Sequence, residues 1–125
     1  MPGNSVLDST VPVLSVDHLE KALRYYESVL GFQVAWTWGD PPHLAGVCRD
    51  RVELNLGERG KAGPAAASQV YFRMRGVDAY FEQISKAGAE TRTPPGDRPY
   101  GMRDFSIRDP SGNVLDFGEA KAANG

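Results

Sequence analysis

Cysteine and histidine are both scarce in this chain of 125 residues. Cys48 is the single cysteine, which excludes an internal disulfide framework and favours a structural role for its thiol. His18 and His43 are the only histidines, and both are expected at the surface. No serine lies in a strained nucleophile turn, so nothing local supports a Ser-His-acid triad.

Long apolar runs and an excess of basic residues are also missing. No segment approaches the roughly 18 consecutive apolar residues of a membrane span, so no membrane partner is expected. Residues 1–10 lack the apolar core of a secretory signal, which makes the cytoplasm the expected location. Lys and Arg number 14 against 16 Asp and Glu, and this balance carries no electrostatic signature of nucleic-acid binding.

The clearest local pattern is a β-hairpin near the end of the chain. The turn-forming residues 109–113 (Asp-Pro-Ser-Gly-Asn) separate two strands of alternating polarity. On the second strand, Asp116 stands between Leu115 and Phe117 and therefore points to the opposite face of the sheet. A carboxylate in that position is either a solvent-exposed strand residue or part of a pocket.

The remaining pattern predicts one domain, residues 1–125, made of two similar halves. Residues 11–16 read as a strand, Asp17 with Glu20 as a capping box, and residues 18–30 as an amphipathic helix closed by Gly31. Strands follow at 32–38 and 44–56, with a turn at 49–51, which completes a first βαβββ module over 11–56. A glycine-rich linker (57–67) leads to a second module over 68–119, and residues 120–125 are expected to form a flexible tail.

The second half repeats the first. Its strand at 69–74, helix from Val77 to Ala87 and short strand at 89–93 precede a 94–97 loop and the hairpin. Leu19 corresponds to Val77 at an offset of 58 residues, and the helix positions that follow keep the same offset. The segments Val52–Glu58 and Val114–Glu119 also match when their shared Gly-Glu is aligned. An internal duplication explains these matches better than two unrelated amphipathic helices.

This layout, the helix sequence 19–32 and the hairpin sequence 108–113 resemble the vicinal oxygen chelate superfamily, which includes glyoxalase I, extradiol dioxygenases and bleomycin resistance proteins. Segments 11–14, 45–50, 75–78 and 100–105 are most similar to the bleomycin resistance branch. The resemblance implies an α+β fold in which two βαβββ modules form curved mixed sheets around a cleft. It also implies a homodimer, with modules paired within or across subunits.

Enzymes of that superfamily hold a metal through His and Glu residues from both halves. By resemblance, the first-strand positions fall on Val11 and Gln69, the last-strand position falls on Asp116, and the remaining one falls on Glu53 or Asn55. This set contains no imidazole, and valine cannot ligate a metal. We therefore expect no metal, no other cofactor and no catalytic residue, with a divalent metal as the alternative.

The same cleft is expected to bind a small planar or aromatic molecule. Tyr100 stands where the bleomycin resistance branch has a stacking Trp, whereas Arg73 departs from an aromatic position and would favour an anionic ligand. Trp38 shares one strand face with Trp36 and borders a loop, so we expect a planar ligand to stack on its ring. The full set of predicted ligand-binding residues is Trp38, Glu53, Asn55, Tyr71, Arg73, Tyr100, Met102 and Asp116.

Three functions follow from these observations. The first is a non-enzymatic protein that binds, and in the manner of antibiotic resistance proteins sequesters, a small molecule. The second is a lyase, isomerase or dioxygenase-type enzyme that uses an unusual metal site, or Glu53 or Asp116 as a general base. The third is a dimeric domain whose cleft serves a partner protein or a regulatory metabolite.

Overall fold

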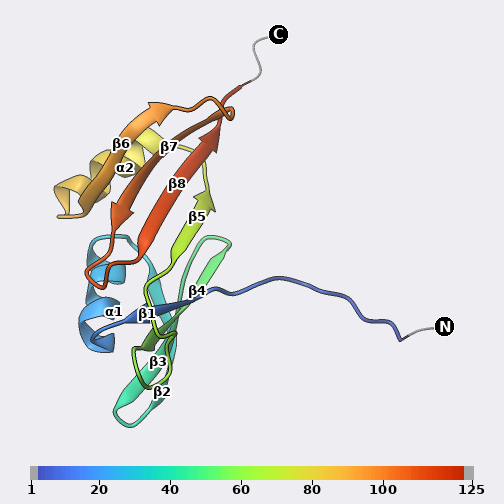
Figure 1. The fold of residues 1–125 in the computed structure, drawn as a ribbon, viewed down its shortest axis with the longest axis vertical. Coiled ribbons are helices and arrows are strands. Elements are labelled where there is room, and N and C mark those ends of the chain that lie inside the picture. Colours follow the sequence, from blue (N-terminus) through green and yellow to red (C-terminus); the bar gives the residue numbers. More distant parts are fainter. Residues whose placement is uncertain (1–2, 123–125) are drawn as a thin grey trace.

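The computed structural model describes residues 3–122, which form two modules of the same design (Figure 1). The first module contains β1 (Val13–Val16), α1 (Leu19–Ser28), β2 (Gln33–Gly39), β3 (Pro42–Arg49) and β4 (Val52–Glu58). The second contains β5 (Gln69–Arg73), α2 (Val77–Lys86), β6 (Glu90–Asp97), β7 (Met102–Arg108) and β8 (Val114–Ala120). Within these residues no helix is both long and apolar enough to cross a membrane.

The two sheets have equivalent strand orders, β1-β4-β3-β2 and β5-β8-β7-β6. In each sheet the first strand runs parallel to the last and the other neighbours are antiparallel. This α+β architecture of two four-stranded mixed sheets is the predicted fold. The strand register also shows which positions of the two halves are equivalent. Val13 pairs with Asn55 in the first sheet, and Tyr71, its counterpart at the offset of 58 residues, pairs with Asp116 in the second. Asn55, rather than Glu53, is therefore the counterpart of Asp116.

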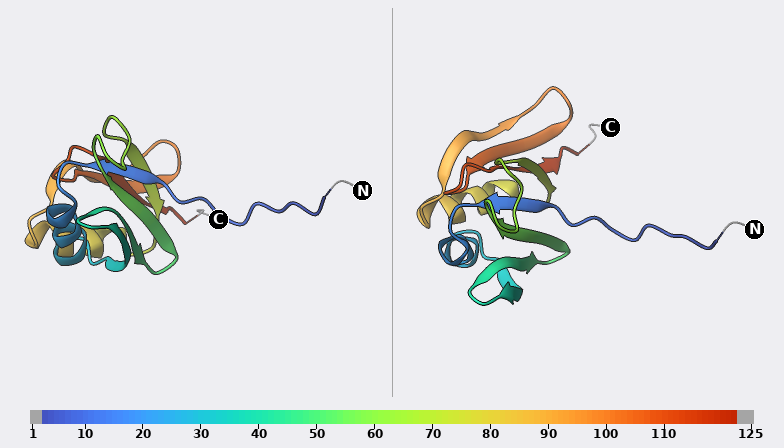
Figure 2. Two further views of the ribbon diagram at one scale, coloured as in Figure 1. Left: turned by 90° about the horizontal axis from the view of Figure 1, so that it is seen from below. Right: turned by 60° about the horizontal axis from the view of Figure 1, so that its bottom comes forward.

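Both helices lie on the same side of the molecule, and the N-terminal segment leaves on the opposite side (Figures 1 and 2). Each helix covers one face of its own sheet, as the alternation of apolar residues requires. In the first module Leu54 and Leu56 are buried beneath α1, and in the second Phe105 stacks on Phe117 with ring centroids 5.2 Å apart. The opposite face of each sheet, called its open face below, carries no helix.

The turn of the terminal hairpin joins the two modules. Asp109 and Asn113 are both buried, and Asp109 accepts a hydrogen bond of 2.7 Å from the hydroxyl of Tyr26 in α1. The side-chain amide of Asn113 donates to the carbonyl of Ser15 in β1 at 2.7 Å. Gly112, with φ of 87°, lets the chain turn between them. The turn sequence is therefore a contact between modules as well as a strand connection.

Several sequence-based boundaries change. The capping box does not form, because the N-cap of α1 is His18 and no side chain caps it, while the Asp17 carboxylate binds Arg59 instead. Residues 94–97 are part of β6 and not a loop. Their prolines are tolerated because β6 is an edge strand with register shifts, where a missing N–H removes no ladder bond.

The module limits also move slightly. β4 extends to Glu58, two residues into the predicted linker, and Ala120, assigned to the tail from the sequence, is the last residue of β8. Residues 123–125 of the predicted flexible tail lie outside the described residues.

Candidate functional site

A pocket of about 390 Å³ lies on the open face of the second sheet. Its lining comes from the strands β5, β6, β7 and β8 and from the loop between β6 and β7. The lining residues are Gln69, Tyr71, Arg92, Thr93, Arg98, Tyr100, Asp104, Ser106 and Asp116. The strand alternation that buries Phe105 and Ile107 against α2 directs Asp104 and Ser106 to this face.

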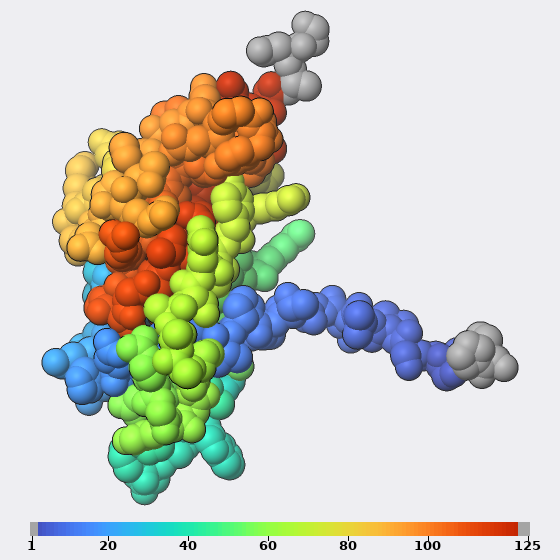
Figure 3. Space-filling model, viewed as in Figure 1, coloured from blue at the N-terminus to red at the C-terminus, as the bar shows by residue number. Residues whose placement is uncertain are grey.

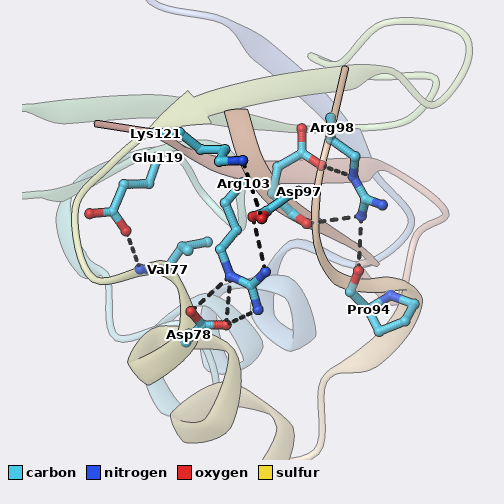
Figure 4. A network of polar contacts seen from close by, with 9 residues as sticks. Val77, Asp78, Pro94, Asp97, Arg98, Arg103, Glu119 and Lys121 are labelled. Atoms are coloured by element: carbon cyan, nitrogen blue, oxygen red, sulfur yellow. Dashed lines mark hydrogen bonds and ion pairs between the residues drawn. The ribbon is translucent and has the colours of Figure 1, made fainter. Parts of the chain in front are cut away.

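Asp104 organises the pocket. Its Oδ2 accepts hydrogen bonds from two phenols, at 2.9 Å from Tyr71 and 2.6 Å from Tyr100. Its Oδ1 accepts one from Nε of Arg98 at 2.7 Å, and the Arg98 guanidinium also reaches the carbonyl of Pro94 at 2.9 Å (Figure 4). The carboxylate is nearly buried, with 6% of the residue exposed. One acidic side chain thus fixes two aromatic rings and an arginine at the pocket wall.

These contacts shift the pKa values of the groups involved. Burial alone would raise the pKa of Asp104, but the hydrogen bonds from Arg98, Tyr100 and Tyr71 outweigh it and hold that pKa below its ordinary value. Burial, and then the bond to the Asp104 carboxylate, raises the pKa of Tyr71 to about 12. The hydrogen bond to Asp104 raises the pKa of Tyr100 as well. At neutral pH Asp104 is therefore charged, and both phenols keep their hydrogens.

A glycine makes this arrangement possible. Tyr71 lies on β5 and Asp104 on β7, so the phenol must cross the intervening strand β8. It crosses at Gly118, the register partner of Asp104, where an added Cβ would overlap the phenolic oxygen. Trp36 lies over Gly46 of the neighbouring strand in the first module in the same way. In both modules a glycine lets an aromatic side chain lie flat on the open face.

The positions that correspond to metal ligands in the superfamily do not form a metal site. Gln69 Nε2 donates to Asp116 Oδ2 at 2.6 Å, so the two second-module positions bind each other. Val11 supplies no donor atom, and its exposed side chain lies in the segment before β1. Within residues 3–122 no three His, Cys, Asp or Glu side chains are grouped to hold a metal ion. The donors present do not fit a divalent metal.

Three of the eight predicted ligand-binding residues, Tyr71, Tyr100 and Asp116, line this pocket. Arg73, on β5, is exposed and does not line the pocket. Met102 lies on the same face of β7 as Asp104 but does not line the pocket either. The other three, Trp38, Glu53 and Asn55, belong to the open face of the first sheet. Within a single chain the structure does not bring these two groups together.

The open face of the first sheet is more apolar than that of the second. Its exposed hydrophobic side chains are Val13, Trp36 and Trp38, and Trp38 is 73% exposed. The linker covers part of this face. Its residues Ala62 and Gly63 pack against Gly57, in the space that a Cβ on Gly57 would occupy. Large exposed apolar groups gathered on one face are characteristic of a surface that binds something.

The two histidines lie at a second, separate hollow of about 480 Å³ between α1 and the β2–β3 turn. There Nδ1 of His43 is 2.8 Å from Oε2 of Glu58, and this hydrogen bond lowers the pKa of the Glu58 carboxyl. Charged side chains of Lys21, Arg24 and Lys61 ring the hollow. It lacks the exposed aromatic rings of the open faces, so the pocket around Asp104 is the better candidate site.

Sequence reasoning missed Asp104, Arg98 and Ser106. Asp104 resembled any polar residue of an alternating strand, and Arg98 was considered only as a neighbour of Tyr100. A signal was nevertheless present, because a turn over residues 109–113 pairs Ser106 with Asp116 and Asp104 with Gly118. This register would have placed Asp104, Ser106 and Asp116 on one face of the sheet.

A family model described as the Glyoxalase/Bleomycin resistance protein/Dioxygenase superfamily matches residues 7–117. The chain belongs to this superfamily. The predicted family is thereby confirmed, and the duplicated βαβββ topology agrees with it. No curated protein sequence matches the chain.

Solved structures similar to this one include both binding proteins and an enzyme. The bleomycin-binding protein of Streptomyces verticillus, in complex with copper(II)-bleomycin, is 25% identical, with a TM-score of 0.70, over 96% of this chain and 99% of its own. TnmS3, an antibiotic binding protein from Streptomyces sp. CB03234, is 23% identical, with a TM-score of 0.72, over 94% and 100%. Lactoylglutathione lyase from Agrobacterium tumefaciens is 20% identical, with a TM-score of 0.73, over 95% and 96%.

Proposed function

We propose that this protein binds and sequesters a small planar or aromatic molecule of the antibiotic type in the cytoplasm, without altering it chemically. The observation that carries this proposal is the pair of phenol rings, Tyr71 and Tyr100, fixed by one buried carboxylate. Rings held in place before the ligand arrives lose little conformational entropy on binding, which favours affinity. The bleomycin-binding and antibiotic binding proteins among the similar structures support this proposal.

The chemistry of the site favours binding over catalysis. Asp104 accepts hydrogen bonds from Tyr71, Tyr100 and Arg98, so it has little capacity left to act as a general base. The superfamily metal positions hold Val11, Gln69 and Asp116, and no step of a metal-assisted reaction can be built on them. Stacking surfaces and a few placed polar groups are what a ligand-binding cleft requires.

We further propose that the working form is a homodimer. The apolar open face of the first sheet carries Trp36 and Trp38, and the open face of the second sheet carries the polar pocket. If the first sheet of one chain faces the second sheet of its partner, Trp38 becomes the wall opposite Tyr100. Such a cleft covers the exposed tryptophans and surrounds a planar ligand with aromatic rings.

The test combines metal analysis with fluorescence. The protein is purified without chelator, its metal content is measured, and tryptophan fluorescence is titrated with bleomycin-type and other planar antibiotics. The proposal predicts substoichiometric metal and saturable quenching. Stoichiometric metal together with turnover of a small electrophile after adding Ni, Zn, Mn or Fe would establish the enzymatic alternative instead.

A further inference from the structure

The floor of the Asp104 pocket contains a buried hydroxyl with no partner. Ser106 is 4% exposed, and its Oγ forms no hydrogen bond within the described residues. It lies directly across from Asp116 in the β7–β8 register, and both side chains line the pocket. A buried polar group without a partner is costly, and most such groups in proteins are satisfied. A ligand that reaches the floor would satisfy this one.

The pocket leaves several acceptor atoms uncommitted on Tyr71, Tyr100 and Asp116, beside the guanidinium donors of Arg92 and Arg98. Tyr71 and Tyr100 each donate their single phenolic hydrogen to Asp104, so toward a ligand their oxygens can only accept. Gln69 donates to Oδ2 of Asp116, which leaves Oδ1 of that carboxylate without a partner among residues 3–122. These atoms suit a ligand that donates hydrogen bonds.

The charges of the lining point the same way. Arg98 is neutralised by Asp104 at 2.7 Å, and its second terminal nitrogen is occupied by the carbonyls of Pro94 and Asp104 (Figure 4). Arg92, on the edge strand β6, also lines the pocket, and it is exposed. Asp116 forms no ion pair with any described residue and is only partly exposed, so the floor carries a negative charge open to a ligand.

We propose that the pocket recognises its ligand through a cationic nitrogen that carries at least two N–H groups, as in a primary ammonium or an amidinium. One N–H donates to Oδ1 of Asp116 and another to Oγ of Ser106, while the rings of Tyr71 and Tyr100 face the adjoining part of the ligand. This inference rests on the proposed binding function and assigns the charge of its ligand. It reverses the anionic preference that Arg73 suggested, because Arg73 does not line the pocket.

The test uses three planar probes of nearly equal shape, benzamidinium, benzamide and benzoate, which differ in charge. Binding is followed at neutral pH by amide chemical shifts of the labelled protein. Benzamidinium is expected to bind at least about tenfold more tightly than benzoate, with benzamide between them. Asp116→Asn should remove that preference. Asp50→Asn, which makes the same charge change in the exposed β3–β4 turn, should leave it unchanged.

A second variant separates a ligand contact from a structural role. Since Ser106 Oγ has no partner among residues 3–122, Ser106→Ala should be at least as stable as the parent and yet bind benzamidinium several-fold more weakly. Equal or tighter binding of benzoate, or a charge preference that survives in Asp116→Asn, would overturn the assignment. If antibiotics still quench tryptophan fluorescence in that case, the binding function stands and only the charge assignment falls. If no probe and no antibiotic binds, both fall.

Discussion

Tyr71 reaches Asp104 by lying across Gly118, at the one point of β8 where the strand has no side chain to obstruct it. The first consequence concerns Gly118→Ala. The added methyl group overlaps the phenolic oxygen, so Tyr71 must leave Asp104 and the pocket wall. We expect ligand affinity to fall about tenfold, the loss of one positioned aromatic contact.

Calorimetric titration measures that loss. Gly3→Ala is the matched control, because nothing lies within 4 Å of its added Cβ. Unchanged affinity in Gly118→Ala would show that the position of Tyr71 does not matter for binding.

Tyr100 tests whether the ring or the hydroxyl carries the binding. The residue is 64% exposed, so Tyr100→Ala should leave the folded state intact and weaken binding of a planar ligand about tenfold. Tyr100→Phe keeps the ring and loses only the bond to Asp104, so it should retain most of the affinity. Equal losses in the two variants would mean that the hydroxyl, not stacking, is decisive. Circular dichroism verifies the fold of both.

The tyrosines predict an unusual alkaline titration. Burial raises the pKa values of both Tyr71 and Tyr80 to about 12, and those of Tyr25, Tyr26 and Tyr100 are raised as well. A raised pKa in the folded state stabilises the fold fully below the unfolded value of about 10, and this contribution is lost as pH rises through 12. The absorbance of the phenolate band should therefore rise at a much higher pH in the folded protein than in the denatured protein. Coincident titrations would refute the burial and bonding described for these phenols.

The hairpin turn predicts a stability effect remote from the pocket. Asn113 is fully buried, and Asn113→Ala removes its bonds to Ser15 and Asp109 and leaves the Ser15 carbonyl without a partner. We expect the free energy of unfolding to fall by about 2–3 kcal/mol. Asn55→Ala, on the open face, should cost less than about 0.5 kcal/mol. Urea denaturation distinguishes the two, and similar losses would argue against the turn as a stabilising contact between the modules.

The sequence predicted the fold well because its signals are local or repeated. The residues from Leu19 to Leu30 have helical spacing and recur at an offset of 58 residues, and the 109–113 turn has strong turn chemistry. The errors arose where tertiary context overrides a local preference. Pro94 and Pro95 belong to a strand because that strand is an edge. Asp17 does not cap its helix because Arg59, placed directly after β4 by the pairing of β4 with β1, binds its carboxylate.

The site was harder to predict than the fold. Tyr71 and Tyr100 could be found because they match aromatic positions of the bleomycin resistance branch, and Asp116 because it interrupts an apolar strand. The hairpin register places Asp104 on the same face as Asp116, but its bond to Tyr71, 33 residues away, depends on the parallel pairing of β5 with β8. Long-range strand pairing is set by the whole sheet and leaves little trace in any short segment.

The open faces of the two sheets give the chain its asymmetry. One carries exposed tryptophans and the other a polar, tyrosine-lined pocket. In the space-filling view the N-terminal segment stands clear of the body, and residues 3–10 are exposed along their whole length (Figure 3). In the proposed homodimer, a second copy would cover the exposed tryptophans and complete a cleft around the pocket.

Native mass spectrometry of the protein mixed with a panel of planar aromatic antibiotics tests the central claim most directly, since it reports subunit number, ligand number and ligand mass together. The account predicts a dimer that retains ligand of unaltered mass, and a Tyr100→Ala dimer that retains much less. A monomer without ligand, or the appearance of a ligand whose mass has changed, would contradict it.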